Sequence, residues 1–492
     1  MKFSDILDMD FVLSYDESLQ TEIDLTPTTK PEEVTKHSAL FIYKRTDGTP
    51  SVSAVDLSSY PAVIVCEAGM ETELDGISVV TVSSARRAFA YACYIHFLGD
   101  LSIMKIIGIT GTNGKTTTAT LLYEILRKSG HSCGFIGTGS IRFNDEVMNT
   151  VNYSMTTPDP DVLYNMLHVM KKRGVEYIVM EVSSHALSLE KLAPLHFNLA
   201  VMTNLSREHM DYHKDMWDYL MAKETLFGMS DKAIFNIDDY YTRIAYYRAR
   251  CEKISVGAIQ SADVSIRDVK LSGLEGSEFI YKGSGAMFRV KSPLPGYYNI
   301  YNSALALASA ISLGVKPCNA RRAIESVLFI PGRCQILKED VTVIIDYAHT
   351  PYAMENLLKF ANSCIIPKQN IITIFGCGGK RDKNKRREMT DIALRLSNKV
   401  IITEDNTRGE NFTEILTDMV GDVNRDDKIV VIQKRREAIR TAILSASSGD
   451  IILLVGKGCE SYMIDADGYH EYSELKEATD ALRIRGAMRN ED

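Results

Sequence analysis

The stretch KIIGITGTNGKTTTAT, residues 105–120, joins an apolar strand to a glycine turn and then to the start of a helix. Isoleucines fill the first part, and residues 117–128 have the composition of a helix. The backbone N–H groups of such a turn, with the dipole of the helix behind them, bind anions. Lys115 is expected to reach the β- and γ-phosphates of a nucleotide, and the Thr116 hydroxyl to lie on Mg²⁺. The stretch therefore predicts a nucleoside-triphosphate site.

The spacing of the glycines departs from the usual phosphate loop. That loop has the pattern G-x-x-x-x-G-K-[S/T], whereas position 109 is isoleucine and the turn carries Gly111 and Gly114. An ordinary glycine turn before a helix is the alternative. Because GKTTT follows a strand directly, we favour a phosphate-binding loop, formed by Gly111, Thr112, Asn113, Gly114, Lys115, Thr116 and Thr117.

The composition is that of a globular protein with several domains. A chain of 492 residues exceeds one hydrophobic core, so about two to four domains are expected. The net charge of −8 argues against broad binding to nucleic acid or to anionic membranes. No apolar run reaches the ~18 residues of a membrane span, and the first residues carry acids where a signal peptide needs a basic and then an apolar run. Since the nine cysteines include no C-x-x-C pair, we predict a cytoplasmic location.

Hydrophobic periodicity divides the chain into three expected domains of an α/β protein. Residues 1–98 form a small N-terminal α/β domain with strands at 38–45, 61–67 and 77–83 and a helix at 84–98. Residues 99–330 alternate strands with helices, as in a parallel sheet, and residues 262–291 add an antiparallel insertion. After the linker Pro331-Gly332-Arg333, residues 331–492 restart the alternation as a Rossmann-like domain. The expected strands of the last two domains are 105–110, 176–182, 199–204, 232–236, 341–347, 370–376, 399–405, 428–432 and 450–456, with a helix at 298–314.

Polar motifs follow nearly every strand of the last two domains. Open parallel sheets bind ligands at the carboxyl ends of their strands, so these motifs are expected to form binding sites. They are TGTNGKT, EVSSH, TNLSREH, NIDD, DYAHTP, GCGGKRD, TEDNTR and GKGCE.

Several side chains in or near these motifs have a structural alternative to a functional role. Glu181 at a strand end suits a Mg²⁺ ligand, but also a cap or an ion pair. His209 and His213 lack the H-E-x-x-H pattern, so a structural histidine competes with a metal ligand. Lys223 lies on a helical run, where a solvated lysine is the alternative. Helix capping competes with recognition of a base for Asn236, Asn299 and Asn302, and with ligand binding for Asp346 and His349.

A basic run, residues 380–387, follows Gly376-Cys377-Gly378-Gly379. In isolation it indicates a solvated face or a nucleic-acid patch, but at a strand end it favours a carboxylate or phosphate site. Arg408 adds a planar fork suited to a carboxylate. Asp405 and Glu460 offer the opposite charge, which suits an ammonium group. Together these charges indicate a zwitterionic ligand.

In this order the motifs resemble the Mur ligase family of peptidoglycan synthesis, closest to its MurE branch. The resemblance covers about residues 100–492 and is weak over 1–98, where DLTPTTKPEEV replaces the usual Asp-Ser-Arg signature for uridine. Its carriers are GTNGKTTT, TTPDP (156–160), EVSSHAL (181–187), TNLSREHMDYH (203–213), AKETLF (222–227), GYYNIYN (296–302), PGR (331–333), DYAHTP (346–351), GCGGKRD (376–382) and GKGCE (456–460).

The resemblance implies roles for individual residues. Lys223 matches a carbamylated lysine, and a carbamate would turn it into an anionic ligand of Mg²⁺. Two Mg²⁺ ions and ATP are implied, with Lys115, Glu181, His209 and Lys223 as catalytic residues and Thr116, Glu181, His209 and Lys223 on metal. ATP is expected on the glycine loop and on Asn299, Arg333 and Asp346. The UDP-sugar peptide is expected on Thr156, Thr157, Ser183 and Lys191, and the amino acid on Arg381, Asp405, Asn406, Arg408, Gly456 and Glu460.

The implied activity is that of an ATP-dependent amide ligase acting on UDP-MurNAc-L-Ala-D-Glu. The D-glutamyl carboxylate attacks ATP to give an acyl phosphate, and an amine then displaces phosphate. Residues 1–98 are expected to bind the UDP-sugar, 99–330 ATP and 331–492 the amino acid. In the family, D-N-P-R marks enzymes that use meso-diaminopimelate, and Asp405-Asn406-Thr407-Arg408 keeps the arginine but loses the proline. We expect meso-diaminopimelate with L-lysine as the alternative, a monomer, no nucleic-acid partner and no membrane insertion.

Further departures from the family pattern leave other functions open. Leu189 stands where glutamine is common, Lys191 where arginine is common, and Gln335 and Cys459 replace glutamate and histidine. A diverged paralogue with another acceptor, including one closer to folylpolyglutamate synthesis, is one alternative, and a non-catalytic nucleotide-binding scaffold is another. TTPDP and the pairing of DNTR with GKGCE favour a MurE-type ligase over these alternatives. A scaffold would need none of Lys115, Glu181, His209 and Lys223.

Overall fold

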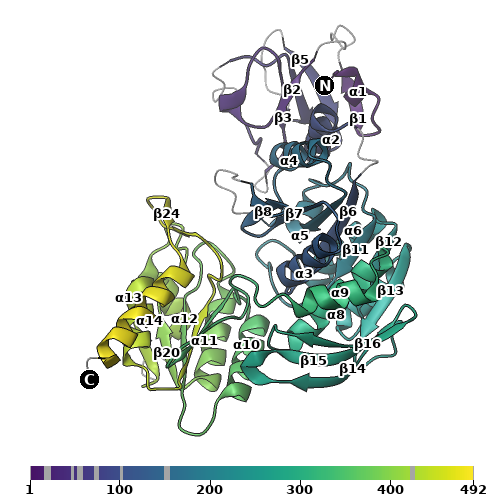
Figure 1. Cartoon of the computed structure of the whole chain (residues 1–492). Helices are drawn as coiled ribbons and strands as arrows, with labels where there is room; N and C mark the ends of the chain where they lie inside the picture. The colour runs from purple at the N-terminus through teal and green to yellow at the C-terminus, as the bar shows by residue number, and fades with distance from the viewer. Residues whose placement is uncertain are drawn as a thin grey trace. The chain divides into compact units, whose positions relative to one another are not determined.

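The computed structural model describes residues 2–15, 24–45, 49–52, 59–70, 77–99, 104–148, 156–421 and 427–490. The chain divides into two compact units, which are Met1–Gly108, His131–Ala200 and Ala222–Asp231, and Ile109–Gly130, Val201–Met221 and Lys232–Asp492. Three elements contribute residues to both units: β6 (Lys105–Thr110), β11 (Leu199–Met202) and α6 (Met216–Gly228). The mixed α/β class predicted from the sequence is confirmed (Figure 1).

The first unit contains a five-stranded sheet with the order β1-β5-β4-β3-β2. Its neighbouring strands are parallel except for β1 and β5. Helix α2 begins after Ser84, whose hydroxyl accepts the N–H of Arg87. The strands and the helix predicted for this region are confirmed. The bounds are α1 (Ser4–Leu7), β1 (Val12–Tyr15), β2 (Thr26–Thr28), η1 (Pro31–Glu33), β3 (Ser38–Ile42), β4 (Val63–Glu67), β5 (Ser78–Val82) and α2 (Ala85–Phe97).

A second run of strands in the first unit has the order β10-β7-β8-β9. Strands β10 and β7 are parallel, whereas β7, β8 and β9 pair antiparallel. Every residue of β10 is buried, as its apolar sequence predicts, and the strand ends at Glu181. The bounds are β7 (Cys133–Gly137), β8 (Ser140–Phe143), β9 (Glu146–Val147), α4 (Pro160–Lys172), β10 (Tyr177–Glu181) and α5 (Ser184–Ser188).

The second unit contains the run β16-β15-β14-β13-β12. Strands β12, β13 and β14 are parallel, and β14, β15 and β16 are antiparallel, which confirms the predicted insertion. Helix α3 begins at Lys115, earlier than predicted, because Gly114 takes the left-handed conformation directly before it. The bounds are α3 (Lys115–Lys128), β12 (Lys232–Asn236), α7 (Tyr240–Arg248), β13 (Glu252–Gly257), β14 (Val264–Leu271), η3 (Gly273–Glu275), β15 (Ser277–Gly283), β16 (Ala286–Ser292), α8 (Tyr297–Ser312) and α9 (Pro317–Glu325).

The C-terminal part of the second unit is a six-stranded sheet with the order β17-β18-β22-β19-β20-β21. It is parallel except for β17, which confirms the Rossmann-like prediction. The bounds are β17 (Gln335–Lys338), β18 (Thr342–Asp346), α10 (Pro351–Cys364), β19 (Ile371–Phe375), α11 (Asn384–Leu396), β20 (Lys399–Ile402), α12 (Phe412–Val420), β21 (Ile429–Val431), α13 (Arg435–Ser445), β22 (Ile451–Val455), β23 (Tyr462–Ile464), β24 (Tyr469–Glu471) and α14 (Glu474–Asn490).

Alternate residues of the C-terminal strands supply two separate cores. Ile344 and Leu453 pack with α10, α11 and α12 on one face. Val343 and Leu454, the neighbours along the same strands, pack with α13 and α14 on the other face (Figure 1). Both faces are apolar because side chains alternate along a strand. The polar residues that follow each strand are thereby left at its carboxyl end.

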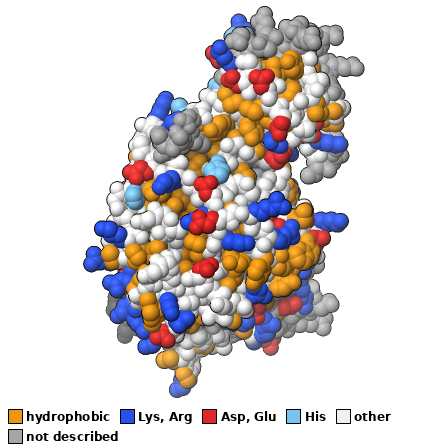
Figure 2. Space-filling view, turned by 90° about the vertical axis from the view of Figure 1, so that its right-hand side faces the viewer, with side chains coloured by type: hydrophobic (Ala, Val, Ile, Leu, Met, Phe, Trp, Pro, Cys, Tyr) orange, Lys and Arg blue, Asp and Glu red, His pale blue; other side chains and the backbone are white. Residues whose placement is uncertain are grey.

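The surface carries both signs of charge. On the face seen in Figure 2, acidic and basic side chains are interspersed among apolar ones. Among the helices of the described residues, none has the length and apolar character needed to cross a membrane.

Candidate functional site

The glycine loop lies between β6 and α3, as predicted. A Cβ at Gly111 would collide with Thr203 Oγ1, and a Cβ at Gly114 with Asn302 Oδ1. Both glycines also have positive φ, 138° and 84°. Position 109 needs no glycine, because Ile109 is a fully buried residue of β6 and the turn begins only after Thr110. The unusual spacing is thus a consequence of where the strand ends.

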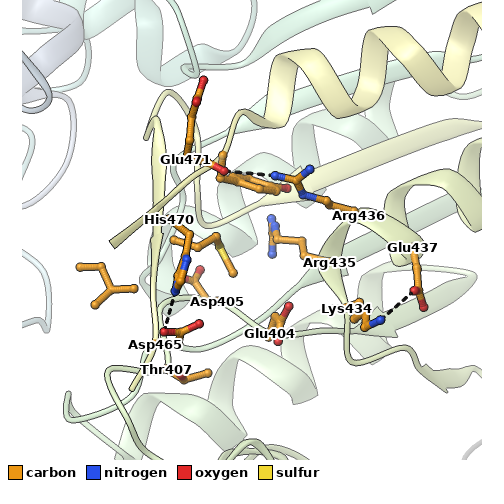
Figure 3. Close-up of a pocket in the computed structure, with 13 residues that line it drawn as sticks. Glu404, Asp405, Thr407, Lys434, Arg435, Arg436, Glu437, Asp465, His470 and Glu471 are labelled. Carbon is orange, nitrogen blue, oxygen red and sulfur yellow. Dashed lines mark hydrogen bonds and ion pairs between the residues drawn. The ribbon is translucent and has the colours of Figure 1, made fainter. Parts of the chain in front are cut away.

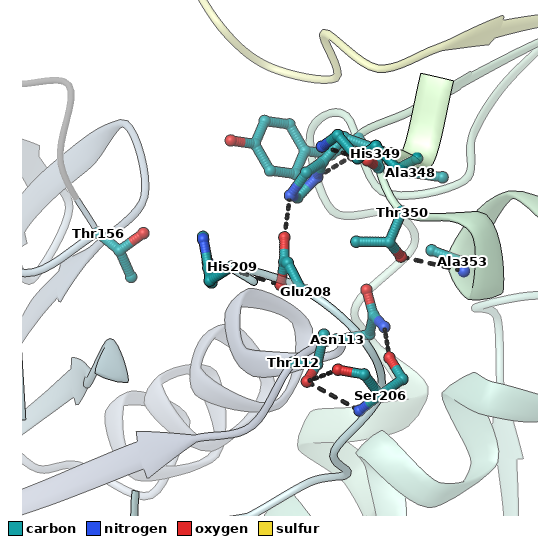
Figure 4. Close-up of polar contacts among 12 residues, drawn as sticks. Thr112, Asn113, Thr156, Ser206, Glu208, His209, Ala348, His349, Thr350 and Ala353 are labelled. Atoms are coloured by element: carbon teal, nitrogen blue, oxygen red, sulfur yellow. Dashed lines mark hydrogen bonds and ion pairs between the residues drawn. The ribbon is translucent and has the colours of Figure 1, made fainter. Parts of the chain in front are cut away.

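Hydrogen bonds from the segment after β11 fix the shape of the glycine loop. Thr112 N donates to Asn204 O at 2.9 Å, and Asn113 N donates to Asn204 Oδ1 at 3.0 Å. Ser206 N donates to Thr112 Oγ1 at 3.0 Å, and Asn113 Nδ2 donates to Ser206 Oγ at 3.3 Å (Figure 4). The loop is therefore held from the segment after β11, which uses the backbone N–H groups of Thr112 and Asn113.

Three predicted nucleotide residues meet at this loop. Lys115 Nζ donates to the carbonyls of Gly111 and Thr112 at 2.9 and 2.8 Å. Arg333 Nη2 donates to Thr116 Oγ1 at 2.8 Å, and its guanidinium lies 4.2 Å from the centre of the Tyr347 ring. Two cations therefore stand at the start of α3, where an anion is favoured.

The three asparagines considered for recognition of a nucleotide base form hydrogen bonds within the protein. Asn299 Nδ2 donates to Pro295 O at 2.7 Å, and Asn302 Nδ2 donates to Asn299 Oδ1 at 2.9 Å. Asn236 Nδ2 donates to Thr203 O at 2.9 Å. Asn299 and Asn302 are buried in the first turns of α8. Asn302 Oδ1 also accepts Thr118 Oγ1 at 3.3 Å, which joins the start of α8 to α3 near Gly114.

Glu208, which the sequence analysis did not select, lies between two histidines (Figure 4). Its Oε1 is 2.5 Å from His349 Nε2, and its Oε2 is 3.7 Å from His209 Nε2. Burial alone would raise the pKa of Glu208, but the charges of His209, His349 and Lys115 hold it well below its usual range. His209 has a φ of 57°, so it sits on a turn. An ionised carboxylate thus stands beside the predicted metal ligand.

His213 has a structural role. Its buried ring places Nδ1 3.2 Å from Asp218 Oδ2. His213 N donates to His209 O at 2.8 Å, which closes a single turn, but residues 203–215 form no helix that could carry both rings as in H-E-x-x-H.

Asp346 at the end of β18 bonds two backbone N–H groups outside any helix, and the cap of α10 is Thr350. Its carboxylate accepts Cys334 N at 2.6 Å and Ala348 N at 2.7 Å. Burial raises the pKa of Asp346, although Arg333 opposes this. The carboxylate fixes the turn that carries Arg333, whose guanidinium reaches Thr116.

A second cluster lies in the first unit, around Glu181. Its carboxylate is fully buried and accepts Thr138 N at 2.9 Å and Thr138 Oγ1 at 3.2 Å. Thr156 Oγ1 is 3.1 Å from Thr138 Oγ1, and Thr157 Oγ1 donates to Glu181 O at 2.9 Å. Ser183 N donates to Thr157 Oγ1 at 3.0 Å. The structure therefore brings Thr156, Thr157, Glu181 and Ser183 together, and adds Thr138.

Lys191 forms an ion pair with the TTPDP motif. Its Nζ is 2.6 Å from Asp159 Oδ1, and 12% of its side chain is exposed. The segment that replaces the family's uridine signature reaches the same helix start, because Lys30 Nζ is 3.2 Å from Asp161 Oδ2. Two lysines thus pair with the acids that open α4.

Lys223 is buried, with 1% of the residue exposed. The solvated lysine weighed as its alternative is therefore wrong. It lies on α6, and the first unit contains both Lys223 and Glu181. Within the described residues, no group of three or more histidine, cysteine, aspartate and glutamate side chains stands ready to hold a metal ion.

The predicted amino-acid residues converge at the carboxyl ends of β20 and β22. Asn406 Nδ2 donates to Glu460 Oε2 at 3.0 Å, and Arg408 Nη1 donates to Gly379 O at 3.3 Å. A Cβ at Gly456 would lie 3.1 Å from Asp405 Oδ2. Burial alone would raise the pKa of Asp405, but the cations Lys457 and Arg435 lower it.

A cavity of about 420 Å³ borders this loop (Figure 3). Asp405 and Thr407 line it together with the first turn of α13 and the β23–β24 hairpin. Arg435, at the start of α13, is buried against Glu474 of α14. The hairpin is attached to the loop, because Ile464 N donates to Asn406 Oδ1 at 2.9 Å.

The basic run 380–387 contains both buried and exposed side chains. Arg386 is fully buried, and its Nη1 lies 2.7 Å from both Glu410 Oε1 and Asp418 Oδ2. Lys385 Nζ donates to His349 O at 2.9 Å. The expectation of a carboxylate or phosphate site over the whole run is therefore wrong for Arg386, which joins α11 to α12. Arg381 is exposed at the strand end.

Glu410→Gln is expected to destabilise the protein by about 1–2 kcal/mol at neutral pH, an estimate that allows for screening by solvent. Hydrogen bonds from Arg386 lower the pKa of Glu410 to about 2. A depressed folded pKa contributes stability above the unfolded value, about 4.3, and loses it as the pH falls toward 2. Urea unfolding at several pH values should show the difference between wild type and variant shrink in that window. Exposed Glu414→Gln, in the first turn of α12, is the matched control and should change little; a pH-independent difference would contradict the assignment.

Three residues of the site were missed, each with a weak signal in the sequence. Lys457 and Glu208 stand in the strand-end motifs GKGCE and SREH. Thr138 follows β7 in the same way that Glu181 ends β10. The strand-end rule that selected the other residues applies to these as well.

Comparison with known proteins places this geometry in a family. The chain matches the Mur ligase middle domain over residues 109–310 and the Mur ligase, glutamate ligase domain over residues 332–458. It is 35% identical over 425 residues to UDP-N-acetylmuramoyl-L-alanyl-D-glutamate--2,6-diaminopimelate ligase 1 of Clostridium acetobutylicum, and the match covers 86% of each protein.

Solved structures share the fold along the chain. A UDP-N-acetylmuramoyl-L-alanyl-D-glutamate--2,6-diaminopimelate ligase has a TM-score of 0.68 and 26% identity, with 99% of both chains covered. The MurF ligase from Thermotoga maritima in complex with ADP has a TM-score of 0.61 and 16% identity, with 95% of this chain and 99% of that chain covered. The predicted resemblance is confirmed: the chain belongs to the Mur ligase family.

Proposed function

We propose that the protein is an ATP-dependent ligase that joins meso-diaminopimelate to the D-glutamyl residue of UDP-MurNAc-L-Ala-D-Glu, in peptidoglycan precursor synthesis. The observation that carries the proposal is a formed glycine loop, with Lys115 and Thr116 at the start of α3, in a family member. The 35% identical relative is named a 2,6-diaminopimelate ligase, which supports the choice of substrates.

The proposed reaction has two steps. A γ-carboxylate oxygen of the D-glutamyl residue attacks the γ-phosphorus of ATP, and the bond from that phosphorus to the bridging oxygen of ADP breaks. The amine nitrogen then attacks the acyl carbon of the acyl phosphate, the carbon–oxygen bond to phosphate breaks, and the nitrogen loses a proton. The products are an amide, ADP and phosphate.

Lys115 and Arg333 act on the phosphate groups in this proposal. Both side chains place a cation at the start of α3. In the structure Lys115 Nζ donates to the carbonyl oxygens of Gly111 and Thr112, at 2.9 and 2.8 Å. A phosphate seated on the loop offers these groups a better acceptor than a carbonyl, because a charged acceptor forms the stronger hydrogen bond. Fixed cations then offset the charge on the transferring phosphoryl group.

The residues present fit Mg²⁺. Thr116 offers a hydroxyl and Glu181 a buried carboxylate, and oxygen ligands are those that Mg²⁺ prefers. His209 and a carbamylated Lys223 complete the proposed ligand set. Bound Mg²⁺ would neutralise charge on the phosphates. Carbamylation would also convert the fully buried Lys223 side chain from a cation to an anion.

The sequence-based domain assignment belongs to the same proposal. Residues 1–98 bind the UDP-sugar, 99–330 bind ATP, and 331–492 bind the amino acid. Thr156, Thr157, Ser183 and Lys191 hold the peptide of the UDP-sugar substrate. The enzyme works as a monomer in the cytoplasm, without nucleic acid or membrane insertion.

Arg408 selects the amine. Its guanidinium lies on the Gly378–Gly379 turn, where a Cβ at Gly378 would come within 2.8 Å of Nη1. The backbone has a φ of 50° at Arg408, so a turn directs the side chain. meso-Diaminopimelate has a second carboxylate for this fork, whereas L-lysine has none.

Arg408→Leu is expected to raise KM for meso-diaminopimelate by roughly a hundredfold, because charged hydrogen bonds to its distal carboxylate are lost. KM for ATP should stay within about twofold. Steady-state phosphate release with each amino acid measures both values, and exposed Arg440→Leu on α13 serves as a matched control. An unchanged ratio of meso-diaminopimelate to L-lysine activity would rule out this role.

The proposed function is tested with the purified protein. Phosphate release is measured with ATP and UDP-MurNAc-L-Ala-D-Glu, with and without meso-diaminopimelate or L-lysine. Stimulation by meso-diaminopimelate supports the proposal, and stimulation by L-lysine alone supports the alternative amine. No stimulation by either amino acid would overturn the assignment and favour a paralogue with another acceptor.

A further inference from the structure

Lys457 is a fully buried lysine at the carboxyl end of β22. Its Nζ donates to Asn406 Oδ1 at 2.9 Å, to Glu460 Oε2 at 2.7 Å and to Tyr462 O at 2.6 Å. An ammonium group has three N–H donors, so these three bonds use all of them. Lys457 therefore has no donor left for a ligand.

These bonds settle which way the Asn406 amide points. Lys457 and the backbone N–H of Ile464 can only donate, so the atom that faces both must be the amide oxygen. The amide nitrogen then faces Glu460 Oε2, at 3.0 Å. One N–H of Asn406 is left to reach another group.

Glu460 is fixed in the same way. Its Oε2 accepts from both Lys457 and Asn406, whereas its Oε1 has only a long contact of 3.5 Å with the Tyr347 hydroxyl among the hydrogen bonds of the described residues. An ionised carboxylate accepts hydrogen bonds and has no N–H or O–H group to donate. Oε1 is thus positioned to accept from an ammonium group.

We propose that Lys457 is a positioning residue that sets the polarity of the amino-acid site, by turning Asn406 into a pure donor and Glu460 into a pure acceptor. The inference rests on the proposed function. A carboxylate of the amino acid then faces Asn406 N–H and the nearby Arg408, and an ammonium group faces Glu460 Oε1 and Asp405. Without Lys457 the Asn406 oxygen keeps only the backbone N–H of Ile464 as a donor, so the amide is held less firmly, and Glu460 loses the cation that holds it.

Lys457→Met tests the proposal in the full-length enzyme. We expect KM for meso-diaminopimelate to rise by roughly thirtyfold or more, because two polar groups lose their charged partner. KM for ATP and for the UDP-linked substrate should stay within about threefold. Trapping the acyl phosphate with hydroxylamine, in the absence of any amino acid, should give hydroxamate at nearly the wild-type rate.

Two further variants separate positioning from folding. Lys457→Gln can donate to two of the three acceptors, so its KM for meso-diaminopimelate should lie between wild type and Lys457→Met. If Lys457→Met does not fold, this variant decides. Lys428→Met removes a lysine that also bonds two carbonyls, Leu394 O and Ser397 O, but outside the amino-acid site. It should leave all three KM values unchanged.

The outcomes are distinct. Equal changes in the three KM values, together with a parallel loss of hydroxamate formation, would mean that Lys457 is merely structural. An unchanged KM for meso-diaminopimelate would also overturn the proposal. A wild-type enzyme that forms hydroxamate but ligates neither amino acid would instead contradict the proposed function.

Discussion

Lys115→Ala is expected to lower kcat for ligation by roughly a thousandfold, since loss of one fixed donor to a developing charge costs about 10²–10³ in rate. Lys115 lies in the first turn of α3, and its Nζ reaches over the glycine loop to the carbonyls of Gly111 and Thr112. No other lysine lies within the loop or the first two turns of the helix. Phosphate release at saturating substrates measures the effect.

Lys128→Ala is the matched control for this variant. Lys128 is at the opposite end of the same helix, where its Nζ donates to Ser326 Oγ at 2.7 Å. It removes the same charge from α3 without touching the loop, so kcat should stay within about twofold. Thermal unfolding of both variants without nucleotide shows whether α3 is intact. A Lys115→Ala enzyme within tenfold of wild type would contradict the role of Lys115.

The sequence predicted the fold because its signals are local. A continuous apolar run such as Val343, Ile344 and Ile345 predicts a strand that is buried on both faces. The structure places Ile344 in one core and its two neighbours in the other. The turn after β6 was visible because Gly111 and Gly114 interrupt an apolar run. A strand and the residues at its end are neighbours in the chain, so the strand-end motifs were also found.

The contacts that organise the site were not predictable from one sequence. Glu208 and His349 are 141 residues apart in the chain, and Arg386 and Glu410 are 24 apart. Charge pairs at such separations are fixed by how the strands are ordered, and β22 enters the sheet between β18 and β19 only after β21. Lys457 acquires Asn406, 51 residues away, from that ordering, whereas Glu460 and Tyr462 are its neighbours along the chain.

Burial was the other quantity that the sequence left open. Lys223 lies on α6, which the sequence allowed to be a solvated surface helix, and Arg386 lies in a strongly basic run. Both are buried, with 1% and 0% of the residue exposed. Periodicity places apolar residues well, but a long cationic side chain gives the same signal whether it faces water or a buried carboxylate.

Lys223→Ala is expected to abolish ligation, with a loss of roughly a thousandfold or more, because the proposed function makes carbamylated Lys223 an anionic ligand of Mg²⁺. Lys223 is buried on α6, and the proposed function makes it an anionic ligand rather than an ammonium group. A carbamate formed from the amine and CO₂ converts the group to a carboxylate-like anion. Bicarbonate or a short-chain acid in excess should restore part of the activity by filling the vacated space.

Two measurements separate this role from packing. Wild-type enzyme equilibrated with ¹³C-bicarbonate should show a carbamate carbon by NMR that Lys223→Ala lacks, independently of activity. Leu226→Ala, on the same helix and also fully buried, removes an apolar side chain and costs about 2–5 kcal/mol of stability. Its kcat should stay within a few-fold of wild type at a temperature where it is folded. Near-normal kcat in unrescued Lys223→Ala, or an equal loss in Leu226→Ala, would show that burial alone explains Lys223.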